Sequence, residues 1–252
     1  MGWVDTHCHL FLHPDPAEEL LARAEAAGVD WVLCPGIDAA TAVEARDLAA
    51  AFPDRVRWSA GLHPHEATRW SGEVETIAAL AADADAVGEC GLDHYRELAP
   101  REVQRIAFAE QVALAAELGK PVVVHCRDAF AEVYEVLADA EPGPWVVLHS
   151  WTGGRRWTRR FAELGVTFSF SGIVTYPTAG SLREAVDLVD PASALVETDT
   201  PYLTPEPRRR DRNEPRNVVA VGEVLADLWG LDVAEVARLT SARAEAVFGR
   251  RP

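Results

Sequence analysis

The 252-residue sequence predicts an α/β protein built as a single (β/α)8 TIM barrel spanning residues 1–252. Eight short, apolar, β-rich runs recur along the chain, and stretches with helical spacing of apolar residues lie between them. The polar or glycine residue that marks the end of each run is 23 to 36 residues from the next, which is room for one strand, one helix and two loops. Eight such units in about 250 residues are typical of a closed parallel barrel. A doubly wound open sheet is the alternative.

The predicted strands cover, in chain order, residues 3–6, 31–34, 56–60, 86–89, 121–125, 145–149, 166–171 and 194–198. The segments between them, such as PAEELLARAEAAG and EVQRIAFAEQVALAAELG, carry apolar residues on one helical face and charges on the other. Three of these segments end at Gly28, Gly119 and Gly165, which favour the left-handed conformation that ends helices. The longest irregular segment, 201–216, is polar and rich in proline, and we expect it to be a functional loop after the eighth strand.

The composition excludes several classes of protein. No apolar run reaches the roughly 18 residues that a membrane helix needs, and the N-terminus lacks the basic and apolar regions of a signal peptide. The four cysteines form no C-x-x-C pair, so we expect neither a zinc ribbon nor a disulfide framework. The formal net charge of −16 argues against a surface that coats nucleic acid. We therefore expect a cytoplasmic protein that does not bind membranes.

Six residues of metal-ligand type interrupt the apolar runs at the carboxyl ends of five predicted strands. They are His7, His9, Glu89, His125, His149 and Asp199. Burial of such groups is costly unless each one is paired or bound to a metal. The carboxyl end of the strands is also where barrel enzymes build their active sites. The sequence therefore predicts a metal site at this mouth of the barrel.

This ligand set is larger than the four ligands of one tetrahedral zinc ion, so we expect one or two divalent ions of Mg, Mn or Zn. Two ions about 3.5–4 Å apart need a bridging anion. The only lysine, Lys120, precedes the fifth strand and is expected at the opposite mouth, so it cannot supply a carboxylated bridge. Glu89 is the one carboxylate on a middle strand at the correct end, and it is the predicted bridging ligand.

Eight short motifs extend this pattern along almost the whole chain. They read DTHCHL, GLHPHE, GECGLDHY, PVVVHCRDAF, LHSWTGG, SFSGIVT, ETDTPYL and RNEP. In this order and spacing the sequence resembles the TatD family of metal-dependent hydrolases, within the amidohydrolase-like barrels. The resemblance implies a (β/α)8 barrel with one or two divalent ions that hydrolyses phosphodiesters in DNA, commonly as an exonuclease. Some relatives are also linked to D-aminoacyl-tRNA deacylation.

The resemblance also divides the ligands into two sites. His7, His9, Glu89 and Asp199 match the first metal site of the family, and Glu89, His125 and His149 match the second. Three positions depart from the family pattern. Arg210 stands where glycine is expected, Trp151 replaces a phenylalanine, and Arg243 replaces an asparagine. None is a ligand, so these changes affect the expected substrate rather than the chemistry.

Four further roles follow from position in the sequence. Asp199 is predicted to be catalytic, because a carboxylate beside a metal can accept a proton from the attacking water. Glu197 and Asp5 are each predicted either to orient a metal ligand or to form an ion pair in the core, and we favour the first role. His63 either contacts a phosphate or leaving group or caps the start of a helix.

Arginines follow three of the ligand-bearing strands. They are Arg127 after His125, then Arg155, Arg156, Arg159 and Arg160 after His149, and Arg208, Arg209, Arg210, Arg212 and Arg216 after Asp199. A basic rim on an acidic protein would attract phosphate to the site alone. We therefore predict that Arg127 and Arg155 bind a DNA substrate, with single-stranded ends stacking on Trp151, Trp157 or Tyr202.

The predicted function is thus a metal-dependent phosphodiesterase, a deoxyribonuclease acting on DNA ends. The first alternative is an amidase, lactonase or aminoacyl-ester deacylase that uses the same metals, and the arginines favour phosphate over it. The second alternative is a barrel that binds metal or nucleic acid without turnover. The native metal, the direction of digestion and the oligomeric state are not predicted.

Overall fold

The computed structural model describes residues 2–249 and has a single eight-stranded sheet with the strands in sequence order. All seven strand pairs within it are parallel. The strands are β1 (Trp3–Asp5), β2 (Val29–Pro35), β3 (Val56–Ala60), β4 (Ala86–Asp93), β5 (Val122–Arg127), β6 (Val146–Leu148), β7 (Thr167–Phe170) and β8 (Ala194–Val196). The predicted barrel is confirmed, and the open-sheet alternative is wrong.

Backbone hydrogen bonds join the first and last strands beyond their ends. The amide of Thr6 donates to the carbonyl of Val196 at 3.1 Å, and the amide of Asp199 donates to the carbonyl of His7 at 2.8 Å. Cys8 and Thr200 form a parallel bridge one residue further along each chain segment. These contacts close the barrel at the mouth where the predicted ligands lie.

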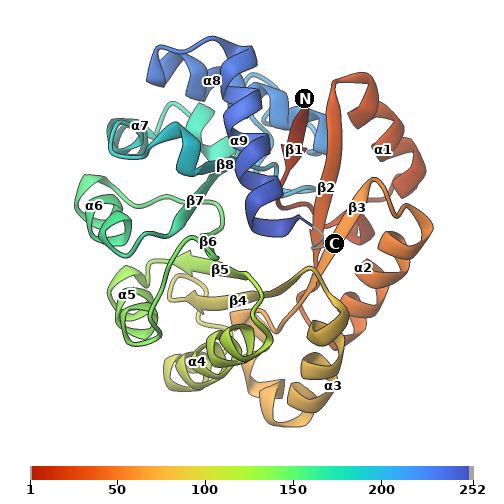
Figure 1. Ribbon diagram of the computed structural model, residues 1–252, viewed down its shortest axis with the longest axis vertical. Coiled ribbons are helices and arrows are strands. Elements are labelled where there is room, and N and C mark those ends of the chain that lie inside the picture. Colours follow the sequence, from red (N-terminus) through yellow and green to blue (C-terminus); the bar gives the residue numbers. More distant parts are fainter. Residues whose placement is uncertain (1, 250–252) are drawn as a thin grey trace.

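Helices surround the strands in the ribbon view (Figure 1). They are α1 (Ala17–Ala26), α2 (Ala39–Ala51), α3 (Trp70–Asp83), α4 (Arg101–Leu118), α5 (Phe130–Asp139), α6 (Arg155–Glu163), α7 (Gly180–Val186), α8 (Val218–Trp229) and α9 (Val233–Phe248). Short 3-10 segments cover Leu10–Leu12, Pro64–Arg69, Gly172–Thr175, Pro191–Ser193 and Pro215–Asn217. The three predicted helix-ending glycines all have positive φ, as expected. Between residues 2 and 249, no helix is both long and apolar enough to cross a membrane.

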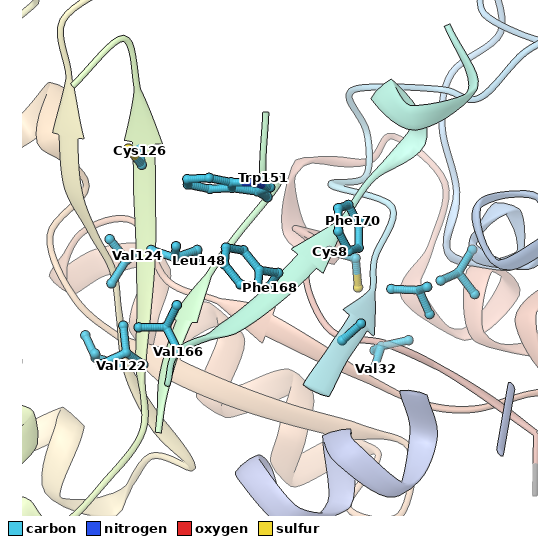
Figure 2. Packing of buried hydrophobic residues seen from close by; sticks show 14 of the residues in the cluster. Cys8, Val32, Val122, Val124, Cys126, Leu148, Trp151, Val166, Phe168 and Phe170 are labelled. Carbon is cyan, nitrogen blue, oxygen red and sulfur yellow. The ribbon is translucent and has the colours of Figure 1, made fainter. Parts of the chain in front are cut away.

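The hydrophobic core has two layers because strand side chains alternate between the barrel interior and the helices. The outer layer includes Val122, Val124, Leu148 and Phe168, which lie close together in Figure 2. The inner layer contains Val123, Val147 and Leu195 and is covered by Ala244 and Phe248 of α9. Helix α9 therefore closes the amino-terminal end of the barrel.

The four cysteines and the single lysine lie where the sequence predicts. All four cysteines are free and buried, so no disulfide forms among them. Lys120 lies just before β5, and its Nζ donates to the carbonyls of Ala81 and Ala82 at 2.8 and 2.6 Å. A cation at the carboxyl end of α3 is favoured by the helix dipole. The lysine is therefore at the mouth opposite the predicted ligands, as expected.

Candidate metal centre

The six predicted ligands converge at the carboxyl-terminal mouth of the barrel, around the carboxylate of Glu89. Three groups have ligand atoms within 4.8 Å of one another: His7, His9 and Glu89; His7, His149 and Asp199; and His63, Glu89 and His125. Residues in β4 and β5 and residues just after β1, β6 and β8 thus meet, although they are far apart in the sequence. This convergence is what the strand-end pattern predicts.

The two oxygens of Glu89 face different sets of imidazoles. Oε2 lies 3.3 Å from Nε2 of His7 and 3.7 Å from Nε2 of His9. Oε1 lies 2.9 Å from Nδ1 of His125 and 3.6 Å from Nε2 of His149. Burial opposes ionisation of Glu89, but the surrounding imidazoles, His63 first among them, hold its pKa well below the usual range. A charged carboxylate between two donor sets has the geometry of a bridging ligand.

Strand β4 places Glu89 in a way that the sequence did not predict. The strand continues to Asp93, so Glu89 lies in its middle rather than at its end. The register against β5 shifts between Val87 and Cys90, which breaks the simple alternation of side chains. Gly91 has φ +133°, and a Cβ there would lie 2.0 Å from the carbonyl oxygen of His125. Glycine at this position therefore allows β4 to lie close to β5.

The imidazole of His9 is oriented by the main chain. Its Nδ1 lies 3.1 Å from the carbonyl oxygen of Pro35, which can only accept, so Nδ1 carries the proton. The lone pair on Nε2 then faces Glu89 and Asp199. Burial and the neighbouring His7 lower the pKa of His9 to about 3, so the ring is neutral at pH 7. A neutral imidazole with its lone pair in a cluster of carboxylates is suited to bind a divalent ion.

Asp199 is the most exposed carboxylate of the cluster. Its side chain is 15% exposed, against 3% for Glu89, and Oδ1 lies 3.8 Å from Nε2 of His7 and 3.7 Å from Nε2 of His9. Its φ of +60° is unusual for a residue with a Cβ, and such backbone strain is often found at functional sites. Burial raises the pKa of Asp199 to about 6, although His149 and His7 oppose the shift.

Glu197 contacts His149 on the side of the ring that faces away from the centre. This is the position from which a carboxylate can orient the ring. Nδ1 of His149 lies 2.7 Å from Oε1 of Glu197, while Nε2 faces the centre. Burial opposes protonation, yet Glu197 and Glu89 together raise the pKa of His149 to about 10. Glu197 is fully buried and also accepts from the amide of Ser150 at 2.9 Å. The carboxylate therefore fixes both the ring and the backbone that follows it.

Asp5 differs from this arrangement, because its hydrogen bonds go to backbone amides and a threonine hydroxyl instead of to a ligand ring. Strand β1 ends at Asp5, and the carboxylate accepts from the amide and hydroxyl of Thr198 at 2.8 and 2.6 Å. It also accepts from the amide of His7 at 3.3 Å. Thr198 directly precedes Asp199, and His7 is itself a candidate ligand. Asp5 thus connects the two backbone segments that carry His7 and Asp199 instead of orienting an imidazole.

His63 enters the centre with a defined hydrogen-bonding pattern. Its Nδ1 accepts from the amide of His65 at 3.1 Å and caps the 3-10 segment Pro64–Arg69. Nε2 lies 3.5 Å from Oε1 of Glu89. Burial lowers the pKa of His63 well below the usual range, so the ring is neutral. A neutral ring whose Nδ1 accepts must carry its proton on Nε2. His63 therefore caps a helix and also presents a donor to the centre.

Asp93 is a buried carboxylate of the site that the sequence analysis missed. Oδ2 lies 2.9 Å from Nε2 of His65 and 3.3 Å from Nε2 of His125. The amide of Asp93 donates to Oε1 of Gln104 at 2.8 Å. Burial opposes ionisation, but His125 and backbone donors hold the pKa of Asp93 below its usual range. The available signal was the carboxylate in the GECGLD motif, but the predicted strand ended at residue 89 and left Asp93 outside it.

Two of the predicted substrate contacts do not lie where we expected. Arg155 is exposed, and its guanidinium contacts the carbonyl of Glu184 on α7 instead of any group of the centre. Trp151 is only 2% exposed and packs against Phe168 in Figure 2, with its Nε1 donating to Thr158 at 2.9 Å. Neither side chain contacts a group of the centre, because Arg155 is engaged by a neighbouring helix and Trp151 belongs to the core.

Arg127 is exposed at the end of β5, two residues beyond His125. Its guanidinium carbon lies 4.0 Å from the ring centroid of Tyr95. Tyr202, on the loop after β8, is 55% exposed, as predicted. The rim of the mouth therefore presents arginine and tyrosine side chains to solvent.

Comparisons with known proteins agree with this geometry. The model of the family described as TatD related DNase matches residues 4–249. A 3'-5' ssDNA/RNA exonuclease TatD from Citrobacter rodentium is 38% identical over 245 residues, covering 92% of this chain and 91% of the relative. An uncharacterized metal-dependent hydrolase, YcfH of Escherichia coli K12, is 37% identical over 250 residues, covering 96% and 93%.

Solved structures give the same result. The crystal structure of YJJV, a TatD homologue of Escherichia coli K12, superposes with a TM-score of 0.91 at 27% identity and covers 99% of this chain and 98% of that one. A β-aspartyl dipeptidase from Fervidobacterium islandicum has a TM-score of 0.63 at 16% identity, covering 98% of this chain and 74% of that one, and shares the fold. The chain belongs to the TatD-related DNase family of metal-dependent hydrolases.

Proposed function

We propose that this chain is a divalent-metal-dependent nuclease that hydrolyses phosphodiester bonds at the ends of single-stranded DNA or RNA. The observation that carries the proposal is the placement of Glu89 between two sets of imidazoles, at the mouth of a TatD-type barrel. The exonuclease named for the Citrobacter rodentium relative supports the substrate class. The arginines on the same rim support a polyanionic substrate over a neutral one.

In this proposal His7, His9, Glu89 and Asp199 hold one ion, and Glu89, His125 and His149 hold a second. The residues fit such ions, because the donor set is buried and the lone pair of His9 faces it. Nitrogen-rich donor sets suit Zn²⁺, whereas Mg²⁺ prefers oxygen ligands and Mn²⁺ accepts both kinds, so we favour Zn²⁺ or Mn²⁺. When bound, the ions supply Lewis acidity toward the phosphate and make a water molecule more acidic.

Asp199 is the proposed proton acceptor. Its carboxylate is the most accessible of the cluster, and its Oδ1 lies within 4 Å of two ligand imidazoles. A water molecule held among these ligands can therefore transfer a proton to Asp199 as it attacks phosphorus. Glu89 is fully engaged by imidazoles and less suited to this role.

His63 is proposed to bind the substrate as a hydrogen-bond donor and not as a third ligand of the second ion. Its Nδ1 is occupied by the amide of His65, so Nε2 carries the proton and cannot coordinate a metal. A neutral N–H directed into the site can stabilise negative charge that develops on a phosphate oxygen.

Amide, lactone and aminoacyl-ester hydrolysis remain the alternative reactions for the same ligands. They are less favoured, since they give no role to the basic rim. The similarity to the β-aspartyl dipeptidase shows a shared fold only, so it does not support these alternative reactions.

The test is cleavage by metal-reconstituted protein of single-stranded DNA and RNA labelled at either end, beside amide, lactone and aminoacyl-ester substrates. We expect stepwise shortening of the single strands with Zn²⁺ or Mn²⁺ and loss of activity with a chelator. Asp199→Asn should remain folded and lose about 10²- to 10⁴-fold in kcat, the usual contribution of a general base. Turnover of an amide or ester in preference to both nucleic acids would contradict the proposal, as would near-wild-type cleavage by Asp199→Asn.

A further inference from the structure

Tyr95 is the most exposed of the large hydrophobic side chains between residues 2 and 249. It is 63% exposed, and Leu98, three residues later, is 62% exposed. Both lie in the loop between β4 and α4, which leaves β4 at the same mouth as the candidate metal centre. Packing within the fold does not explain an aromatic ring in this position, because the ring is largely in solvent.

The backbone of Tyr95 is fixed by a carboxylate of the centre. Oδ1 of Asp93 accepts from the amides of Tyr95 and Arg96 at 2.9 and 2.8 Å. Oδ2 of the same carboxylate lies 3.3 Å from Nε2 of His125. One buried side chain thus holds both a proposed metal ligand and the loop that displays the ring. The position of Tyr95 relative to the reacting groups is therefore set by the fold.

Arg127 forms the second part of this surface. It pairs with Asp93 in the β4–β5 register, and its carbonyl accepts from the amide of His94 at 2.9 Å. The guanidinium stacks on the Tyr95 ring at 4.0 Å. Among the described residues, no carboxylate lies within 4 Å of the Arg127 guanidinium. Its positive charge is thus available to a ligand while the side chain is held flat against the ring.

We propose that the Tyr95–Arg127 stack is a binding platform for one unpaired nucleobase of a single-stranded substrate. This inference rests on the proposed nuclease function and adds the element that recognises the substrate. An aromatic ring stacks on any base, and a stacked guanidinium can bind the adjoining phosphate. A base inside a duplex has both faces covered by its neighbours, so the platform favours an unpaired nucleotide over a paired one within a duplex. Because stacking does not depend on the base, the platform favours single strands without reading their sequence.

The test compares single strands that carry either a normal or an abasic nucleotide at the cleaved end. The kcat/KM of each strand is measured with the active enzyme. The equilibrium binding of fluorescently labelled strands is measured in the Asp199→Asn protein, in which cleavage is slow. The normal strand should have a higher kcat/KM and bind more tightly than the abasic strand by roughly 5- to 150-fold, the contribution of one stacked base. Tyr95→Ala should lose this preference and leave the rate on the abasic strand unchanged. Tyr95→Phe and Tyr95→Trp should retain it.

Tyr134 supplies a matched control, because it stacks on Arg160 at 4.2 Å on the outer helices α5 and α6. Tyr134→Ala removes the same kind of pair away from the mouth and should keep the preference. The proposal is overturned if the Asp199→Asn protein binds normal and abasic strands equally, or if adding Tyr95→Ala to it weakens the binding of both strands to the same extent. Base preference in binding, together with no cleavage of either strand by the metal-reconstituted wild type, would leave the platform standing and contradict the nuclease function.

Discussion

His63 illustrates how one hydrogen bond decides the role of a residue. By distance alone it belongs to a metal-binding group with Glu89 and His125. The amide of His65, however, occupies the Nδ1 lone pair, and this leaves a protonated Nε2 toward the centre. Distance and proton placement thus point to different roles, and the proton placement is the stronger constraint because an N–H group cannot coordinate a cation.

Substitution of His63 should therefore affect turnover and not metal content. His63→Ala is expected to lower kcat by roughly 10²- to 10³-fold, the cost of removing one donor to a developing oxyanion. The number of ions per chain, measured by elemental analysis after reconstitution, should equal that of the wild type. His125→Ala is the control and should lose one ion per chain. Loss of an ion from His63→Ala would instead identify His63 as a ligand.

At the same scale, the sequence predicted polar residues that interrupt apolar runs better than it predicted the ends of the strands. The six candidate ligands were identified because each interrupts an apolar run, a signal that does not depend on the turn that follows. Asp93 was missed because the predicted strand ended at residue 89, whereas β4 continues to Asp93. Trp151 was expected to bind substrate because it closely follows the candidate ligand His149. Its amide instead donates to the carbonyl of Ser169 on β7 at 2.8 Å, and its side chain is buried in the core.

Among the elements, β4 depends on glycine where it approaches β5. Gly91→Ala should destabilise the protein by about 1–3 kcal/mol or more, because a Cβ would meet the His125 carbonyl and φ is positive. Gly119→Ala is the control for ordinary left-handed strain, since its φ of +62° lies in the αL region and its added Cβ would meet no other part of the chain within 4 Å. Thermal and denaturant unfolding of both variants would show how much more the Gly91 substitution costs than a left-handed residue in open space. Equal losses would contradict the predicted overlap with the His125 carbonyl.

Helix α2 begins with a capping box that links its stability to pH. Asp38 accepts from the amide and hydroxyl of Thr41 at 2.8 and 2.6 Å and pairs with Arg69 at 3.0 Å. Burial opposes ionisation, but these partners lower the pKa of Asp38 below its usual value. The stabilisation is therefore fully present above the pKa of the unfolded chain, near 4, and is lost as pH falls through the lower folded-state pKa.

Substitutions at Asp38 separate the charge from the hydrogen bond. Asp38→Ala should cost about 1 kcal/mol at pH 7, the usual value of a helix cap. Asp38→Asn keeps an acceptor without a charge, so the difference in stability between this variant and the wild type should shrink as pH falls below about 4. Urea unfolding from about pH 7 to about pH 2.5 is the measurement. A difference between the Asp38→Asn protein and the wild type that does not change with pH would show that the carboxylate charge is not stabilising.

The order and type of the elements could be predicted because each strand run and helical repeat is a local pattern. Their bounds could not, since they depend on pairing: β1 stops at Asp5, whereas β2 extends to Val29–Pro35 against neighbours on both sides. Near a register shift, the direction of a side chain also depends on how the strand pairs with its neighbour, and a local sequence pattern does not show this. Glu89 lies beside such a shift, between Val87 and Cys90, so its place in the middle of β4 could not be predicted from the sequence.

At the scale of the whole molecule, the two ends of the barrel are chemically different. Helix α9 covers the amino-terminal end with Ala244 and Phe248, whereas the carboxyl-terminal end holds the candidate centre. Asn213 anchors the long loop after β8 by donating to the carbonyls of Thr198 and Tyr202 at 2.8 and 2.6 Å. The exposed arginines of this loop are thus held near the mouth by the backbone that carries Asp199.

This arrangement predicts how salt acts on substrate binding. The chain has a formal net charge of −16, so long-range repulsion of nucleic acid is overcome only where arginines gather. Arg208 and Arg210 are exposed and, within residues 2–249, have no carboxylate within 4 Å. If each neutralises one phosphate of a single strand, replacing both with Ala should reduce the slope of log K against log salt by about 1.4.

The control removes the same charge from other faces of the protein. Arg46 on α2 and Arg238 on α9 are exposed and paired with Asp47 and Glu235 at 2.9 and 2.7 Å. Their double Ala variant changes the net charge by the same two units, so it reports the effect of total charge alone. Binding of a labelled single strand from about 50 to about 300 mM salt should show the shallower slope only for the loop variant. Identical slopes in both variants would mean that total charge, and not the arginines at the mouth, governs the approach of the substrate.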